Sequence, residues 1–166
     1  RGDETTDFAL NIHSSKFDRC GTKGRGLGAG GALAAWFSGG SSRVALRVSA
    51  CQFERNTGGD RGGGSIAVWY GGSVINDVLL ALERSTFSAN TAVGNGGAIS
   101  IENVGESTQG MAMTIAACAF SGNNSTGANG GAFSLSVSGG GYGIGELDGV
   151  KVEVTDSSFV NNSVTA

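Results

Sequence analysis

The chain repeats a two-part pattern about five times: a Phe-x-x-Asn step, then a Gly-Gly pair followed by a small or apolar residue. In one clear copy, Phe87 and Asn90 precede Gly96 and Gly97. The second glycine of each pair recurs at positions 31, 64, 97 and 131, so the steps are 33, 33 and 34 residues. A fixed period of this length is typical of a solenoid, in which each unit buries its apolar face only against its neighbours.

Apolar residues alternate with polar ones ahead of each Phe and again after each Gly-Gly pair, which is the periodicity of strands. A one-residue phase slip before the Phe indicates a bend between two strands. We therefore expect an all-β parallel β-helix (β-solenoid) of about five coils of roughly 33–39 residues, with three short strands per coil. A helical fold is disfavoured because Gly-Gly pairs would interrupt it. An antiparallel sandwich stays an alternative, although it gives no reason for identical side chains in identical positions.

The Phe and Asn columns are predicted to stack from coil to coil. Asn tolerates the left-handed backbone conformation at a corner, and its amide can donate and accept along the stacking axis. Such a ladder would satisfy turn backbone groups that are otherwise buried without a partner. Cys20 replaces Asn in the first copy, so the ladder should weaken there. The predicted core stack is Phe17, Phe53, Phe87, Phe120 and Phe159, and the predicted structural ladder is Asn56, Asn90, Asn123 and Asn162.

Composition narrows the class of protein. The 166 residues suit a single β-helix domain over 1–166, and 39% are hydrophobic, which is enough for a core. Charged residues make up 15% and the net charge is −3, so no basic patch for nucleic acid is expected. No apolar run is long enough for a membrane span. The pattern suggests a fragment of a longer solenoid, with further coils or neighbouring subunits as partners at both ends.

Phe-x-x-Asn together with Gly-Gly-Ala-Ile resembles the repeat of the chlamydial polymorphic outer membrane proteins, which is also found in algal and protist surface proteins. The likeness extends from about Phe8 to Ser163, with Cys20 in place of Asn and Ser65 in place of Ala as departures. The resemblance implies a right-handed parallel β-helix and an extracellular or cell-surface location, often with an adhesive role.

Catalytic chemistry would need carboxylates, a base and often an Arg converging from neighbouring coils. Asp18 and Glu54 share a column, but the next three copies place Ser88, Ser121 and Val160 there. We therefore predict no catalytic, cofactor-binding or metal-binding residues and no cofactor.

The three cysteines are not expected to form a disulfide. Cys51 and Cys118 share a column but lie two coils apart, so their Cα atoms should be roughly 9.6 Å apart. A disulfide needs about 7 Å or less. Cys20 lies at a corner in another column.

Trp36 and Trp69 occupy equivalent positions on adjacent coils and should point outward as a flat aromatic ladder. Such a surface suits a sugar ring or a partner protein, unless loops or a further segment of the protein cover it. Tyr142, in the longest loop, is a second possible contact. Asn124 and Asn161 are possible N-glycosylation sites in a secreted protein, with Asn124 favoured.

We expect an extracellular or cell-surface structural or adhesive segment that presents loops and an aromatic face to partner proteins or glycans. The alternative is the non-catalytic part of a polysaccharide-acting β-helix enzyme. The two differ because the flanking coils of an enzyme would carry clusters of Asp with Arg or His on one face.

Overall fold

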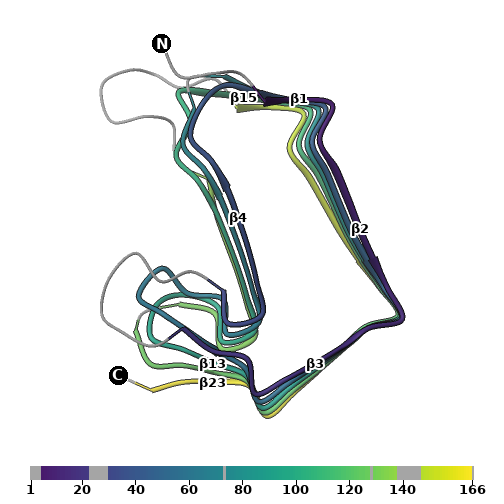
Figure 1. Ribbon diagram of the computed structural model, residues 1–166, viewed down its shortest axis with the longest axis vertical. Helices are drawn as coiled ribbons and strands as arrows, with labels where there is room; N and C mark the ends of the chain where they lie inside the picture. Colours follow the sequence, from purple (N-terminus) through teal and green to yellow (C-terminus); the bar gives the residue numbers. More distant parts are fainter. Residues whose placement is uncertain (1–4, 23–29, 73, 128, 138–146, 166) are drawn as a thin grey trace.

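A computed structural model describes residues 5–22, 30–72, 74–127, 129–137 and 147–165. These residues form strands, turns and loops, with no helix among them. The strands stack in parallel into five sheets, which Figure 1 shows end-on as the sides of a coil. The predicted all-β parallel solenoid is confirmed.

Each turn of the chain passes through the sheets in the order A, B, C, D, E. Sheet A holds β1 (Thr5–Thr6), β5 (Ser41–Ser42), β10 (Val74–Asn76), β15 (Ser107–Gln109) and β20 (Leu147–Asp148). Sheet B holds β2 (Ala9–His13), β6 (Ala45–Ser49), β11 (Leu79–Glu83), β16 (Ala112–Ala116) and β21 (Lys151–Thr155). Sheet C holds β3 (Lys16–Asp18), β7 (Gln52–Glu54), β12 (Thr86–Ser88), β17 (Ala119–Ser121) and β22 (Ser158–Val160).

The two remaining sheets have four strands each. Sheet D holds β8 (Thr57–Gly58), β13 (Thr91–Ala92), β18 (Asn124–Ser125) and β23 (Ser163–Val164). Sheet E holds β4 (Leu33–Phe37), β9 (Ile66–Tyr70), β14 (Ile99–Asn103) and β19 (Phe133–Val137). The chain therefore makes about four turns, somewhat fewer than the five repeats in the sequence suggest, because the first and last copies are partial.

Sheets B, C and E are the three strands per coil that the alternation predicts. Sheets A and D were not predicted. Their strands have only two or three residues, which is too short for an alternating pattern to stand out from a turn.

The predicted columns are confirmed by the strand register. In sheet B, Leu46 pairs with Leu80 and Leu80 with Met113, and in sheet E, Ile66 pairs with Ile99. Away from the terminal coils, the inward side chains of these columns are buried in the interior of the solenoid. Each coil thus buries its apolar side chains against the same positions of the next one.

The phase slip between sheets B and C is a corner with left-handed backbone. The residue at the bend has a positive φ in successive coils, for example 51° at Ala50 and 46° at Arg84. A residue in this conformation reverses the alternation of the strand, which explains why the inward pattern shifts by one position.

The Gly-Gly pair is needed for both conformation and space. Gly96 has φ 67°, in the left-handed region. A Cβ on Gly97 would collide with the backbone carbonyl of Gly131 in the next coil, because the two coils approach closely at this point. The second-glycine column therefore marks a close contact between coils that leaves no room for a side chain.

The five predicted Phe rings form one stack along the coil axis. Adjacent ring centroids are 4.7–4.9 Å apart and the rings are within 7° of parallel. Phe53, Phe87 and Phe120 are fully buried, whereas Phe159, in the last coil, is 47% exposed. The stack is thus covered in the middle and open at the C-terminal coil.

Candidate binding surfaces

The four ladder asparagines are linked from coil to coil by hydrogen bonds. Asn90 donates from its backbone N–H and from its side-chain amide to Oδ1 of Asn123, at 3.0 and 2.9 Å. The same amide also donates to the backbone carbonyl of Phe53, at 3.0 Å. Asn56 bonds to Asn90 and Asn123 to Asn162 in the same way. The ladder therefore ties each Asn corner to the Phe column, which accounts for their constant spacing in the sequence.

One detail of the ladder differs from expectation. The left-handed conformation falls on the residue before each asparagine, for example Ala89 at φ 52°, and not on the asparagine itself. This preceding residue makes the bend on the exposed side, so the Asn side chain can turn inward, where Asn90 is fully buried. At Cys20 the ladder retains only a backbone donor, which bonds to Oδ1 of Asn56 at 2.9 Å.

The cysteines are free thiols, and Cys51 and Cys118 have a local hydrogen-bonding role that the sequence did not reveal. Each lies at the B–C corner and donates to the carbonyl two residues earlier, as Ser85 does between them. A small side chain with one donor fills this position in every coil, which explains why Cys and Ser alternate there. Burial raises the pKa of the Cys118 thiol.

Trp36 and Trp69 point outward from β4 and β9 and stack on each other. Their ring centroids are 4.3 Å apart, with 27° between the planes. Trp36 is 42% exposed, whereas Trp69 is half-buried and its indole N–H has no hydrogen-bond partner in the structure. Trp36 stands on β4, an edge strand of sheet E, so no strand of this sheet covers the face of its ring that is turned away from Trp69. Trp36 is therefore the more accessible indole.

Arg61, from the loop between β8 and β9, lies beside this aromatic pair. Its guanidinium carbon is 4.8 Å from the Trp36 ring centroid and 5.7 Å from that of Trp69, a cation–π arrangement. Arg61 also forms an ion pair with Glu102, with a nitrogen–oxygen distance of 3.7 Å. Glu102 is the register partner of Trp69 on the neighbouring strand β14. The ring of Trp69 occupies the space that a side chain on Gly71 would need. Sequence reasoning missed Arg61 because loop lengths vary between the repeats.

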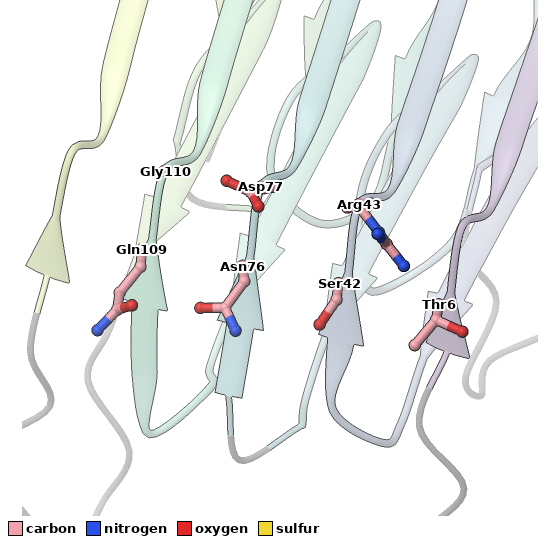
Figure 2. Close-up of a pocket in the computed structure, with 7 residues that line it drawn as sticks. All are labelled: Thr6, Ser42, Arg43, Asn76, Asp77, Gln109 and Gly110. Atoms are coloured by element: carbon pink, nitrogen blue, oxygen red, sulfur yellow. The ribbon is translucent and has the colours of Figure 1, made fainter.

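A second surface feature, a polar groove, runs along the coil axis where sheet A turns into sheet B. It has a volume of about 450 Å³. Figure 2 shows one wall as a row of polar side chains from adjacent strands, and the bend as a row of corner residues. The wall is Thr6, Ser42, Asn76 and Gln109, and the bend includes Arg43, Asp77 and Gly110.

The groove exists because of the backbone at its bend. Arg43, Asp77 and Gly110 all have positive φ, at 53°, 49° and 66°. These residues lie three positions before the inward column of Leu46, Leu80 and Met113, so an aligned polar column was visible in the sequence. Nothing in that column indicated a concave surface, because concavity depends on the corner geometry.

The charges in the groove are partly paired. Arg43 contacts Asp7 with a nitrogen–oxygen distance of 2.7 Å. The carboxylate of Asp77 makes no ion pair with any described residue, and it lies over Gly110, whose missing side chain leaves it room. Oδ1 of Asn76 is buried and lacks a hydrogen-bond partner in the structure. The groove thus contains polar groups that make no hydrogen bond or ion pair with the described residues.

A cluster of exposed charges lies on the outer face of sheet C. Arg55 contacts Asp18, at 2.9 Å, and also Glu54, which in turn lies 3.5 Å from Lys16. The hydrogen bond from Arg55 holds the pKa of the Asp18 carboxyl below its ordinary value. Exposed ion pairs of this kind contribute little to stability. Among the described residues, no three His, Cys, Asp or Glu side chains are arranged to hold a metal ion.

The two possible glycosylation sites differ in accessibility. Asn161 is exposed at a corner with φ 54°. Asn124 is half-buried, and its side chain bonds to Ser163 and Thr165 of the next coil. Asn161 therefore offers the freer amide, although the sequence favoured Asn124. Tyr142 lies outside the described residues.

Comparisons with known proteins add no family to this geometry. No protein-family model matches the chain, and neither a curated protein nor a solved structure matches it. In the described part of the chain, no helix has the length and apolar character needed to cross a membrane.

Proposed function

We propose that the chain is a structural or adhesive segment of an extracellular or cell-surface protein, and that it presents an aromatic face to glycans or partner proteins. Two observations support the class of protein: the parallel solenoid fold, and the likeness of its repeat to that of the chlamydial polymorphic outer membrane proteins. In such proteins the solenoid is a rigid support, and binding takes place on its outer surface.

The stacked pair of Trp36 and Trp69 is the observation that carries the proposal. Both side chains stand on strands held by parallel neighbours, so their positions are set before a ligand arrives. A surface ordered in advance loses little conformational entropy on binding. An indole face suits the apolar face of a sugar ring, and Trp with Arg is also the composition of protein-binding hot spots. Arg61 and Glu102 add charged hydrogen-bonding groups at the edge of the pair.

The test is to replace both tryptophans with serine and to measure binding to a panel of immobilised oligosaccharides and to candidate surface proteins. We expect at least a tenfold loss of affinity for a ligand that stacks on the indoles, since truncation of a hot-spot Trp costs about 2 kcal/mol or more. Val74→Ser is the matched control because Val74 is also 42% exposed but lies on sheet A. If the double variant folds and binds every ligand as the unchanged chain does, the aromatic face is not a binding site.

Location and activity can be tested separately. An antibody to the chain should label intact cells that express the protein as strongly as permeabilised ones. Labelling that needs permeabilisation would contradict a surface location. Release of reducing ends from a bound polysaccharide would contradict a purely presenting role and favour a polysaccharide-acting enzyme.

A further inference from the structure

We propose that the polar groove between sheets A and B binds a neutral, linear polysaccharide that lies along the solenoid axis. This site goes beyond the proposed function because it lies on other sheets than the Trp36–Trp69 pair and shares no residue with it. In Figure 1 sheet A lies between sheets E and B, so the two surfaces face different sides of the coil.

The geometry of the groove suits a long ligand. Thr6, Ser42, Asn76 and Gln109 are register partners in sheet A, one from each of four successive coils. Neighbouring strands are about 4.8 Å apart, so this row of hydrogen-bonding side chains extends over roughly 14 Å. Figure 2 shows the four side chains next to one another along the groove. A polymer whose hydroxyl groups recur ring after ring can meet one such side chain at each coil.

The unused polar groups make the groove suitable for hydroxyl groups. A sugar hydroxyl can donate to the carboxylate of Asp77. It can also donate to Oδ1 of Asn76 once that side chain rotates toward the groove, because in its present orientation this oxygen is buried and has no partner among the described residues. Gln109 is exposed and offers both a donor and an acceptor. Binding would therefore satisfy a buried acceptor that is costly to leave unpaired.

The charges determine which polysaccharide fits. Among the described residues at the bend, the carboxylates of Asp7 and Asp77 stand against one guanidinium, that of Arg43, which is already paired with Asp7. The unpaired charge at the bend is thus negative, and it would repel the carboxylate or sulfate groups of an acidic polysaccharide. A neutral chain avoids this repulsion and keeps all the hydrogen bonds.

A peptide fits the groove less well. An extended peptide presents side chains on one face about every 6.6 Å, which does not match the spacing of about 4.8 Å between coils. The residues that line the groove include no aromatic or aliphatic anchor of the kind that carries protein interfaces. The strands of sheet A already pair along the axis, so a peptide lying in the groove would cross them and could not join the sheet.

The experiment titrates the chain with neutral hexasaccharides (cellohexaose, mannohexaose and xylohexaose) and with the hexamer of galacturonic acid as the acidic counterpart. Calorimetry measures affinity, and hydrogen–deuterium exchange locates the bound region in the unchanged protein. We expect a neutral hexamer to bind and to slow exchange in the peptide containing β15 and Gly110. The acidic hexamer should bind more weakly or not at all.

The groove variant is Asn76→Ala with Gln109→Ala, and Gln52→Ala is the matched control because Gln52 is an exposed strand amide on sheet C. The groove variant should weaken binding at least about tenfold, from the loss of two hydrogen-bonding side chains. Gln52→Ala should leave the affinity unchanged, and so should serine at both Trp36 and Trp69.

Several results would overturn the proposal. These are the absence of binding by every neutral hexamer, preference for the acidic one, or protection by the neutral hexamer only in peptides of sheet E. Loss of binding in the tryptophan variant alone would support the aromatic face and reject the groove. The exchange measurement decides the matter even if the groove variant fails to fold.

Discussion

The side-chain amide of Asn90 donates to Oδ1 of Asn123 in the next coil, at 2.9 Å, and Oδ1 of Asn90 accepts the backbone N–H of Asn56, at 3.0 Å. Both side chains are fully buried. The ladder therefore supplies the hydrogen-bond partners that water would otherwise give to the backbone groups buried at the corner.

Replacing Asn90 with alanine should lower the free energy of unfolding by about 3 kcal/mol, because the buried N–H of Asn56 loses its acceptor and several hydrogen bonds disappear together. Denaturant titration followed by circular dichroism measures the change. Asn11→Ala, at an exposed site on sheet B, should change stability by less than about 0.5 kcal/mol. Equal effects of the two substitutions would contradict a stabilising ladder.

Gly97→Ala should be much more damaging than Gly122→Ala. A Cβ on Gly97 would strike the backbone of the next coil, whereas a Cβ on Gly122 meets nothing within 4 Å. Overpacking costs about 1–3 kcal/mol or more. Gly122 has φ 61°, and Arg55 and Ala89 adopt the same conformation at the equivalent corner, so its replacement should cost about 1 kcal/mol. Thermal melts of the two variants compare these costs, and a lower Tm for Gly122→Ala would refute the close-approach explanation.

Thiol labelling should count one accessible cysteine in the folded protein and three after denaturation. Cys20 is partly exposed, whereas Cys51 and Cys118 are 1% and 2% exposed. Burial raises the pKa of Cys118, so its reactive thiolate becomes populated only at higher pH than usual. Intact-mass measurement after alkylation checks the count. A mass lower by two hydrogen atoms, with a single label, would mean that the strand register is wrong.

The chain of residues 1–166 should self-associate in solution. Val152, Val154 and Phe159 of the last coil are 46%, 50% and 47% exposed, whereas their register partners Met113, Ile115 and Phe120 are at most 1% exposed. Open strand edges next to apolar side chains favour association.

Analytical ultracentrifugation tests this prediction, with Phe159→Asp expected to reduce association. Thr155→Asp is the charge-matched control because Thr155 lies on the outer face of β21. A stable, monodisperse monomer of the unchanged chain would disprove the prediction.

The sequence was most informative about residues whose environment repeats. The columns of Leu46 and Ile66 were correctly aligned because inward and outward positions alternate within a strand. Corners were harder to predict. The left-handed backbone at Ala89 has no residue signature of its own, and the strands of two or three residues in sheets A and D are too short to show alternation. Arg61 beside Trp36 and the groove at Asp77 depend on contacts between separate segments, which spacing alone cannot reveal.

The asparagine ladder also implies an order in which the coils can be completed during synthesis. Each corner is completed by an acceptor that comes later in the chain, as Asn123 does for the N–H of Asn90, 33 residues earlier. During translation the corner at Asn90 therefore keeps its backbone N–H and one side-chain N–H without this acceptor until about one more repeat has left the ribosome. Force measurements with translation-arrest peptides should show tension that rises in steps of one repeat. If the coils close one at a time in this order, only the newest coil has Asn and corner N–H groups without their acceptors, so we expect the order of synthesis to disfavour pairing of the near-identical repeats out of register.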